Sequence, residues 1–239
     1  MTSSADAPGA RSRGVDVSGL RDGLVGSLPL APSVFVYGTV FGGLAVQSGL
    51  HPLEVWGMSL LVFAGAAQFV VVPMLAAGAS PLAIIVTTYV VNMRHYLMAA
   101  TLAPAFRAFP RPWLALVAHG INDESFAVAV ARRNPPDPWC FVGSVLAVAG
   151  SFLAGVPVGT QVGGLVADPA RWGLDFAFPA VFLALVAAQL RRRADGLVAL
   201  ASAALAVAIA LVLPGTWHII IAGVLVSGLA ALALPPEPA

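Results

Sequence analysis

Residues 89–100 read YVVNMRHYLMAA, and they lie within an apolar run over 81–103 that is long enough to cross a lipid bilayer. A membrane-spanning helix needs about 20 consecutive apolar residues. Asn92, Arg94 and His95 stand near the middle of this run, although a charged side chain at the bilayer centre costs at least ~2.5 kcal/mol. The stretch therefore predicts a membrane protein with a polar site inside the membrane.

The composition of the whole chain supports this prediction. Of 239 residues, 59% are hydrophobic and 10% are charged, whereas a soluble domain has about 25% charged residues. The predicted fold class is therefore all-α, a polytopic integral membrane protein. A net charge of +1 without a basic, aromatic-rich patch argues against a nucleic-acid partner. The lone Cys140 excludes a disulfide framework and a cysteine-based metal site, and we expect no metal and no cofactor.

Eight apolar segments, separated by turn-forming residues, are candidate membrane-spanning helices. They cover 29–48, 55–77, 81–103, 112–131, 139–166, 174–190, 197–213 and 215–234. Seven helices remain possible if 139–166 or the region of Pro214 is not a simple crossing. We expect a transmembrane permease domain over 24–234, after a disordered cytoplasmic tail over 1–23 and before a short polar tail over 235–239.

The arginine residues in the loops predict the orientation, because positive residues gather on the cytoplasmic side. With the N-terminus inside, eight loop arginines lie inside, and three lie outside, namely Arg107, Arg111 and Arg171. The prediction is therefore that both termini face the cytoplasm.

The chain also resembles itself at an offset of 121 residues. YGTVFGGLA at 37–45 resembles VGTQVGGLV at 158–166, and the Ala-Ala-Gln at 66–68 recurs at 187–189. Internal repeats are common in secondary transporters, while chance similarity between helices rich in glycine and alanine is the alternative. The repeat would be parallel with eight helices.

Each copy of this repeat contains a GxxxG motif. The motif glycines are Gly38 and Gly42 in the first copy and Gly159 and Gly163 in the second. Small residues at this spacing favour close packing between membrane helices. Unwound backbone at a binding site is the alternative.

A second polar cluster, HGINDES at 119–125, lies at the centre of the segment 112–131. Arg94 and this cluster have the same predicted depth in neighbouring antiparallel segments, so we expect Arg94 to face a carboxylate of Asp123 or Glu124. If each helix is continuous, the pair Asn92 and His95 shares one face, and so does the pair His119 and Asp123. Asn122 completes the list of candidate site residues in this cluster.

Two simpler explanations of these polar residues stay open. The third helix could end at Val91, with Arg94 and His95 at the membrane interface, or the ion pair could serve structure alone. Gln68, central in the second segment, is equally consistent with a site residue and with a hydrogen bond between helices.

Five motifs, in order along the chain, resemble the AzlC family, the large subunit of bacterial branched-chain amino acid exporters. They are GTVFGGLAVQSGL at 38–50, SLLVFAGAAQF at 59–69, NMRHYLMAATLAP at 92–104, NDESFAV at 122–128 and DFAFPAVFLAL at 175–185. The resemblance runs from about 24 to 230, and after about 195 it rests on generic apolar composition. Gln68, Arg94 and the Asp123–Glu124 pair fall on the family's Ala-Gly-x-x-Gln, Asn-x-Arg and Asp-Glu positions.

The resemblance implies a multi-pass permease of the bacterial inner membrane that works with a small hydrophobic AzlD-like subunit. It also implies proton-driven export of leucine, isoleucine or valine, and of methionine in some members. The residues fit this chemistry, since a zwitterion needs an anion for its ammonium and a cation for its carboxylate. Asp123 or Glu124 and Arg94 could supply them, and Asp123, Glu124 or His95 could exchange the proton.

Two other functions remain as alternatives. The first is a carrier or channel for another small zwitterionic or hydrophobic metabolite. The second is an intramembrane enzyme, but the chain lacks the GxSG motif of a rhomboid-type protease and the HExxH motif of a metalloprotease. We therefore expect no catalytic residues and no enzymatic activity.

Overall fold

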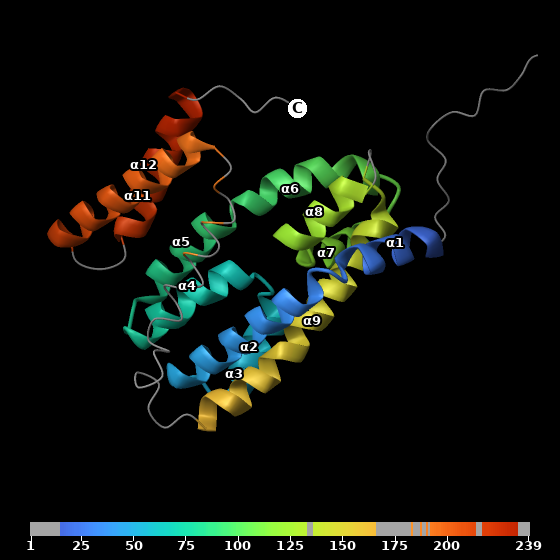
Figure 1. Cartoon of the computed structure of the whole chain (residues 1–239), viewed down its shortest axis with the longest axis horizontal. Coiled ribbons are helices and arrows are strands. Elements are labelled where there is room, and N and C mark those ends of the chain that lie inside the picture. The colour runs from blue at the N-terminus through green and yellow to red at the C-terminus, as the bar shows by residue number, and fades with distance from the viewer. Residues whose placement is uncertain are drawn as a thin grey trace, which may run out of the picture.

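The computed structural model of the chain describes residues 15–132, 136–165, 183, 187, 190, 192–213 and 217–233. Within these residues the chain forms helices and no strand, which confirms the predicted all-α class (Figure 1). The predicted sixth segment, 174–190, lies almost wholly outside the described residues, as do residues 1–14 and 234–239.

The chain enters the bundle through α1 (Val17–Ser27), which is bent by 66° from the helix that follows it. Asp16 caps α1, because its Oδ1 atom accepts a hydrogen bond from the backbone N–H of Ser18 at 3.0 Å. Gly19 and Gly23 are buried in this helix. The predicted disordered tail over 1–23 is therefore wrong from Val17 onward, because a cap and a small-residue face allow this polar segment to pack as a helix.

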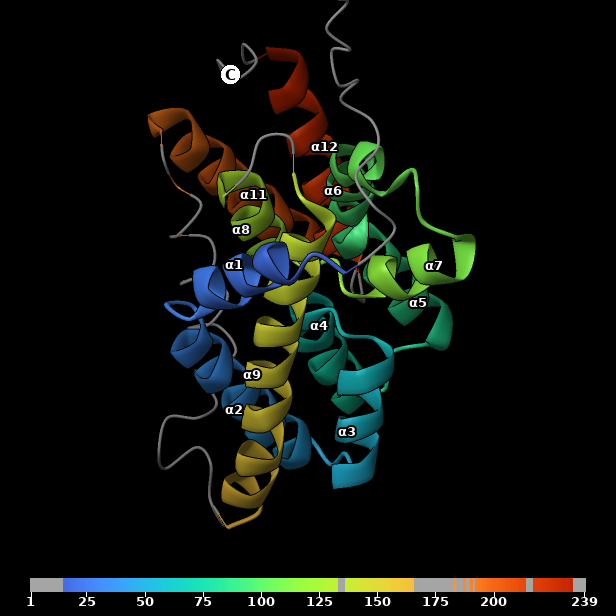
Figure 2. The ribbon, with the colours of Figure 1, turned by 90° about the vertical axis from the view of Figure 1, so that its right-hand side faces the viewer.

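Two long helices, α2 (Ala31–Gln47) and α9 (Pro138–Leu165), run side by side in the same direction (Figure 2). The predicted motif glycines of α2 lie at their contact. A Cβ atom added at Gly38 would collide with the carbonyl oxygen of Phe152, and one at Gly42 with that of Val156. The backbones approach this closely because glycine has no side chain.

The motif glycines of α9 lie at the same contact from the other side. A Cβ atom at Gly159 would collide with the carbonyl oxygen of Thr39, and one at Gly163 would lie 2.7 Å from the Cα of Gly43. Both helices are regular through their glycines. The structure therefore places all four glycines at a helix contact and not at unwound backbone. The glycine motifs of the two repeat copies thus lie on parallel helices, while the internal repeat itself stays a prediction, since most of the second Ala-Ala-Gln lies outside the described residues.

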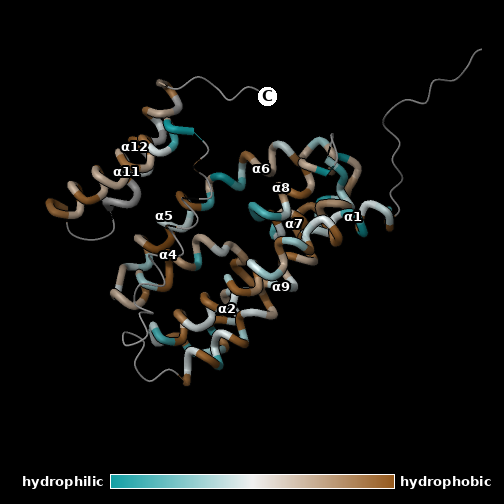
Figure 3. The backbone as a smooth tube through the Cα atoms, in the orientation of Figure 1, coloured by the Kyte–Doolittle hydropathy of each residue, from teal (hydrophilic) through white to brown (hydrophobic). Residues whose placement is uncertain are grey.

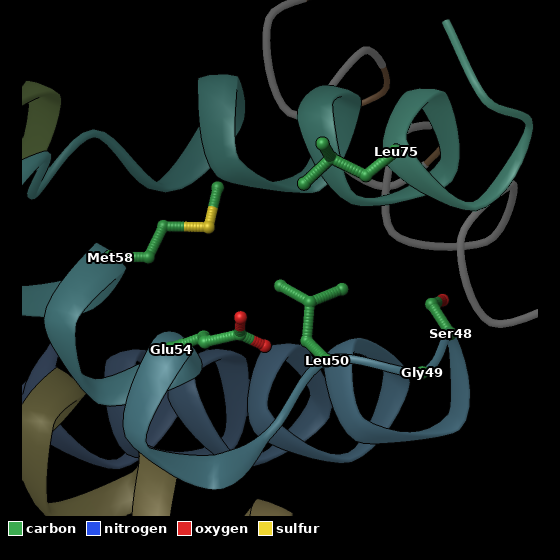
Figure 4. A pocket seen from close by; sticks show the side chains of 6 residues that line it. All are labelled: Ser48, Gly49, Leu50, Glu54, Met58 and Leu75. Carbon is green, nitrogen blue, oxygen red and sulfur yellow. The ribbon is translucent and has the colours of Figure 1, made fainter.

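The second predicted segment, 55–77, is divided into α3 (Pro52–Leu61) and α4 (Gly65–Ala76). Phe63 between them has φ +43°, a left-handed conformation that is uncommon for a residue with a side chain. After this break α4 turns back. Leu75 near its end and Leu50 point toward each other across a pocket of about 430 Å³ (Figure 4). This pocket is lined by Ser48, Gly49, Leu50, Glu54, Met58 and Leu75.

Both ends of the α3–α4 segment therefore lie near the end of α2, which we call the Leu50 end of the molecule. The prediction that 55–77 forms one straight crossing is wrong in this respect. Its length and hydrophobicity allow a crossing, but the break at Val62–Ala64 lets the chain return. We call α3 and α4 the first hairpin and the residues 60–65 its tip.

The third predicted segment continues through the bundle, with an interruption. α5 (Pro81–Asn92) ends where α6 (Arg94–Leu102) begins, and Met93 lies between them. A short 3₁₀ helix, η1 (Ala103–Phe106), follows. The Phe106 ring lies 5.9 Å from the ring of Phe141 near the start of α9. The segment thus runs from the Leu50 end to the opposite end of the molecule, and the helix is interrupted directly after Asn92.

The fourth predicted segment, 112–131, folds back on itself. α7 (Arg111–His119) and α8 (Asp123–Arg132) are bent by 112° relative to each other. The Trp113 ring lies 5.3 Å from the Trp139 ring at the start of α9. At the other end of the segment, a Cβ atom at Gly26 would lie 2.9 Å from Nε of Arg132.

Both ends of α7–α8 are therefore at one end of the molecule, which we call the Trp139 end, and the predicted straight helix over 112–131 is wrong. The physical cause is a helix start inside the apolar run. Asn122 caps α8, because its Oδ1 atom accepts a hydrogen bond from the backbone N–H of Ser125 at 2.8 Å. We call α7 and α8 the second hairpin and residues 119–123 its tip.

The last described helices, α11 (Arg193–Val212) and α12 (Trp217–Ala233), pack against each other, and α12 also contacts α5. Among the described residues, α9 and α11 are each long and apolar enough to span a membrane, and the pairs α1–α2 and α7–α8 would qualify if each were one span. The number of crossings stays a prediction. If neither hairpin crosses the membrane, two of the eight predicted crossings are lost, and both termini are still predicted on the same side.

Candidate functional site

The two hairpins meet at their tips. The Nε2 atom of His119, the last residue of α7, donates a hydrogen bond to the carbonyl oxygen of Leu60 at 2.9 Å. The rings of His119 and Phe63 are 6.2 Å apart. Because one hairpin extends from the Leu50 end and the other from the Trp139 end, this contact lies between the two ends of the bundle.

An ion pair joins the second hairpin to the interrupted helix. The Nη2 atom of Arg94 lies 2.9 Å from Oδ2 of Asp123, and the two side chains are 37% and 50% exposed. The expected approach of Arg94 to a carboxylate of the next segment is therefore present. Hydrophilic residues at the α5–α6 junction stand out against the apolar helices around them (Figure 3).

The helix ends also explain the two histidines. His95 Nδ1 donates to the carbonyl oxygen of Asn92 at 3.1 Å, so these residues interact although the helix is interrupted between them. His119 and Asp123, in contrast, do not form the predicted pair on one helix face. α7 ends at His119 and α8 starts at Asp123, and the two side chains bind Leu60 and Arg94 instead.

The remaining residues of the second cluster shape the start of α8. Asn122 caps α8 and also donates from Nδ2 to the carbonyl oxygen of Gly120 at 3.1 Å. Glu124 follows Asp123 in the first turn and is half-buried. Within the described residues Glu124 has no ion-pair partner, and no group of three or more side chains could hold a metal ion.

Gln68 lies in the first turn of α4, directly after the tip of the first hairpin. It is fully buried, and within the described part of the chain neither its Nε2 nor its Oε1 atom has a hydrogen-bond partner. The buried Oγ1 of Thr87 and Oδ1 of Asn92 on the neighbouring α5 are also without a partner there. Buried polar groups are normally paired, so these exceptions need an explanation.

Two residues that the sequence interpretation missed belong to this region. The ring of Tyr37 on α2 packs on Phe69 at 4.5 Å and lies against Gly65, the first residue of α4. Phe63 forms the left-handed turn at the first tip. A tyrosine in the middle of an apolar helix is a readable signal, because its hydroxyl needs a polar neighbour. Nothing in the sequence indicates the conformation of Phe63.

Comparisons with known proteins identify the family of this chain. A family model described as AzlC protein matches residues 29–166, which include both hairpins. The chain is 32% identical over 181 residues to the inner membrane protein YgaZ of Escherichia coli (strain K12), covering 72% of this chain and 74% of that protein.

Two further relatives extend the comparison. The chain is 30% identical over 176 residues to an uncharacterized membrane protein of Archaeoglobus fulgidus, covering 72% of this chain and 77% of the relative. It is 26% identical over 217 residues to the branched-chain amino acid transport protein AzlC of Bacillus subtilis (strain 168), covering 89% and 85%. No solved structure matches the chain. The chain is a helical, multi-pass membrane protein and belongs to the AzlC family.

Proposed function

We propose that this chain exports branched-chain amino acids across the bacterial inner membrane. Leucine, isoleucine and valine are the expected substrates, and methionine is a further candidate. The proposed transporter uses the proton gradient and acts together with a small hydrophobic AzlD-like subunit. A relative named as a branched-chain amino acid transport protein supports the substrate class, and a relative named as an inner membrane protein supports the location.

The observation that supports transport best is the ion pair between Arg94 and Asp123, at the junction of an interrupted helix and a hairpin tip. Charged residues inside a membrane domain are costly, and they mark pathways for substrates or protons. Interrupted helices form the substrate sites of many secondary transporters, because their ends present free backbone groups to the ligand. Both features occur here at the same place.

The direct test is the efflux of a panel of labelled amino acids from cells with and without this chain and its small subunit. We expect faster efflux of leucine, isoleucine and valine when both are present. A panel in which no branched-chain amino acid leaves faster would contradict the proposed function.

Proton coupling is tested separately with the variants Asp123→Asn and Glu124→Gln in inside-out membrane vesicles. We expect at least one variant to lose the uptake of leucine that a pH gradient drives. If both variants retain the wild-type response to the gradient, these carboxylates do not couple transport to protons.

The alternative is a carrier or channel for another small zwitterionic or hydrophobic metabolite. Flux that persists without a proton gradient would favour this alternative. Membership of the AzlC family supports a transporter over an enzyme, and one relative is named as a branched-chain amino acid transport protein.

A further inference from the structure

We propose that the carboxylate of the transported amino acid binds at the N-terminus of α4, held by the backbone N–H groups of residues 65–67 and the side-chain amide of Gln68. This inference rests on the proposed transport function and assigns one part of its site. It differs from the expectation that Arg94 binds the carboxylate.

The start of α4 is open to an anion. The first N–H groups of a helix have no partner within the helix, and the helix dipole is positive there. Ala64 at the cap provides no side-chain hydrogen bond, and the first turn contains no acidic residue. Gly65, Ala66 and Ala67 are small, so a ligand can approach their backbone closely. Helix N-termini of this kind are established sites for carboxylates and phosphates.

Gln68 is the independent observation that indicates a ligand. Its side chain is fully buried, and both polar atoms lack a partner within the described residues. Side chains of a helix lean toward its N-terminus, so the amide of Gln68 extends over the first turn of α4. A buried amide without partners is unfavourable in the empty protein. A carboxylate bound at the helix start would accept the hydrogen bond that the Nε2 atom now lacks.

Aromatic side chains complete the wall of this site. The ring of Tyr37 lies so close to Gly65 that a Cβ atom there would be 2.7 Å from its Cε1. The Tyr37 hydroxyl is 3.5 Å from the same position, which places a further donor beside the helix start. The Phe69 ring packs at a tilt against the rings of Tyr37 and Phe41, with ring centroids 4.5 and 5.5 Å apart. This apolar wall suits an aliphatic side chain.

The start of α8 has the opposite character. Asn122 caps it, and Asp123 and Glu124 follow in its first turn. Asp123 is paired with Arg94 at 2.9 Å, so both charges are compensated without substrate. Glu124 then offers the anionic partner for the substrate ammonium. Because the two hairpin tips touch through His119 and Leu60, a zwitterion could bridge the α4 and α8 helix starts.

The experiment compares KM and maximal rate for labelled leucine in inside-out vesicles that contain the full chain and its small subunit. For Gln68→Leu we expect KM to rise about tenfold or more, because a hydrogen bond to a charged group is lost. The matched control is Gln161→Leu, since Gln161 is exposed on α9 and, within the described residues, its Nε2 atom donates to the carbonyl oxygen of Pro157 in the same helix. We expect this control to keep the wild-type KM.

Competing ligands identify which group of the substrate Gln68 contacts. Leucine and leucinol, which lacks the carboxylate, are compared as inhibitors of labelled leucine uptake. The wild type should prefer leucine strongly, and Gln68→Leu should lose most of this preference. Removing an unsatisfied amide should also raise the thermal unfolding temperature of the ligand-free protein, which a residue that only supports the fold would not do.

A second variant covers the case in which Gln68→Leu does not fold. Ala66→Asp places a carboxylate in the first turn of α4, where it stabilises the helix dipole and occupies the anion site. We expect a higher unfolding temperature together with loss of leucine affinity. The inference would be overturned if the wild type transports leucine but either variant, Gln68→Leu or Ala66→Asp, keeps the wild-type KM and the wild-type preference for leucine over leucinol. The proposed function would survive that result. If the wild type moves no amino acid, the proposed function fails and the inference fails with it.

Discussion

Arg94 and Asp123 are the first residues of two different helices, α6 and α8, and their side chains meet at 2.9 Å. The positive end of a helix dipole stabilises an aspartate and destabilises an arginine. Asp123 is therefore favoured at its own helix start, and it also offsets the unfavourable location of Arg94. We therefore expect substitution of Asp123 to cost more stability than substitution of Arg94.

For Asp123→Ala we expect leucine transport to fall about tenfold or more, since Arg94 then stands at a helix start without a counter-charge. Unfolding in detergent should reveal a coupling of about 1 kcal/mol between Asp123→Ala and Arg94→Gln. The double variant should regain stability relative to Asp123→Ala without regaining transport. Strictly additive changes in unfolding free energy would contradict a direct interaction.

The contact between the hairpin tips gives a second prediction. His119→Leu removes the hydrogen bond to Leu60, so we expect transport to fall about fivefold to tenfold from the loss of about 1 kcal/mol. His119→Gln keeps a donor at a similar reach and should retain most of the activity. Equal losses of transport in both variants would show that the hydrogen bond to Leu60 does not determine the transport rate. The measurement is the initial rate of leucine uptake in vesicles.

Packing between α2 and α9 gives a third prediction with its control on the same helix. Gly159→Ala would push a methyl group into the carbonyl of Thr39, so we expect a loss of about 1–3 kcal/mol in unfolding free energy. Gly150→Ala has open space around the new methyl group, and alanine favours a helix over glycine by about 1 kcal/mol. It should be neutral or stabilising. The measurement is the thermal unfolding of the purified variants. A Gly159→Ala variant as stable as Gly150→Ala would disprove the close contact between α2 and α9.

Much of the site could be predicted from the sequence because charges inside apolar runs are rare. Arg94 and the carboxylates lay at the same depth of adjacent segments, which was enough to expect their pairing. The spacing of Gly38 and Gly42, and of Gly159 and Gly163, likewise indicated close helix contact. These predictions needed only residue type and spacing along a helix.

The two hairpins could not be predicted from length, because a folded-back pair of short helices and one crossing both need about 20 apolar residues. One signal was readable. Gly120 followed by Asn122, Asp123 and Glu124 has the pattern of a helix end and a new helix start. The break at Phe63 has no such signal, since its left-handed backbone is uncommon for a residue with a side chain. The pairing of His119 with Asp123 was wrong for the same reason, because it assumed an unbroken helix.

The hairpins also improve the agreement with the distribution of arginine. They place Arg107 and Arg111 at the Trp139 end, together with Arg132. If that end faces the cytoplasm, Arg107 and Arg111 lie inside with Arg132, whereas straight crossings put them outside. This is a stronger bias than straight crossings give. The predicted orientation thus becomes testable at two positions where the alternatives differ.

The central claim is that the two hairpins enter the membrane from opposite sides and meet at their tips. It is tested by labelling two single variants, Ala77→Cys and Ala108→Cys, with a membrane-impermeant maleimide in spheroplasts and in inside-out vesicles. Both alanines are exposed, whereas Cys140 is buried and serves as an unlabelled internal reference. The account predicts labelling of Ala77→Cys in spheroplasts and of Ala108→Cys in inside-out vesicles. The reverse pattern, which straight crossings require, would contradict it.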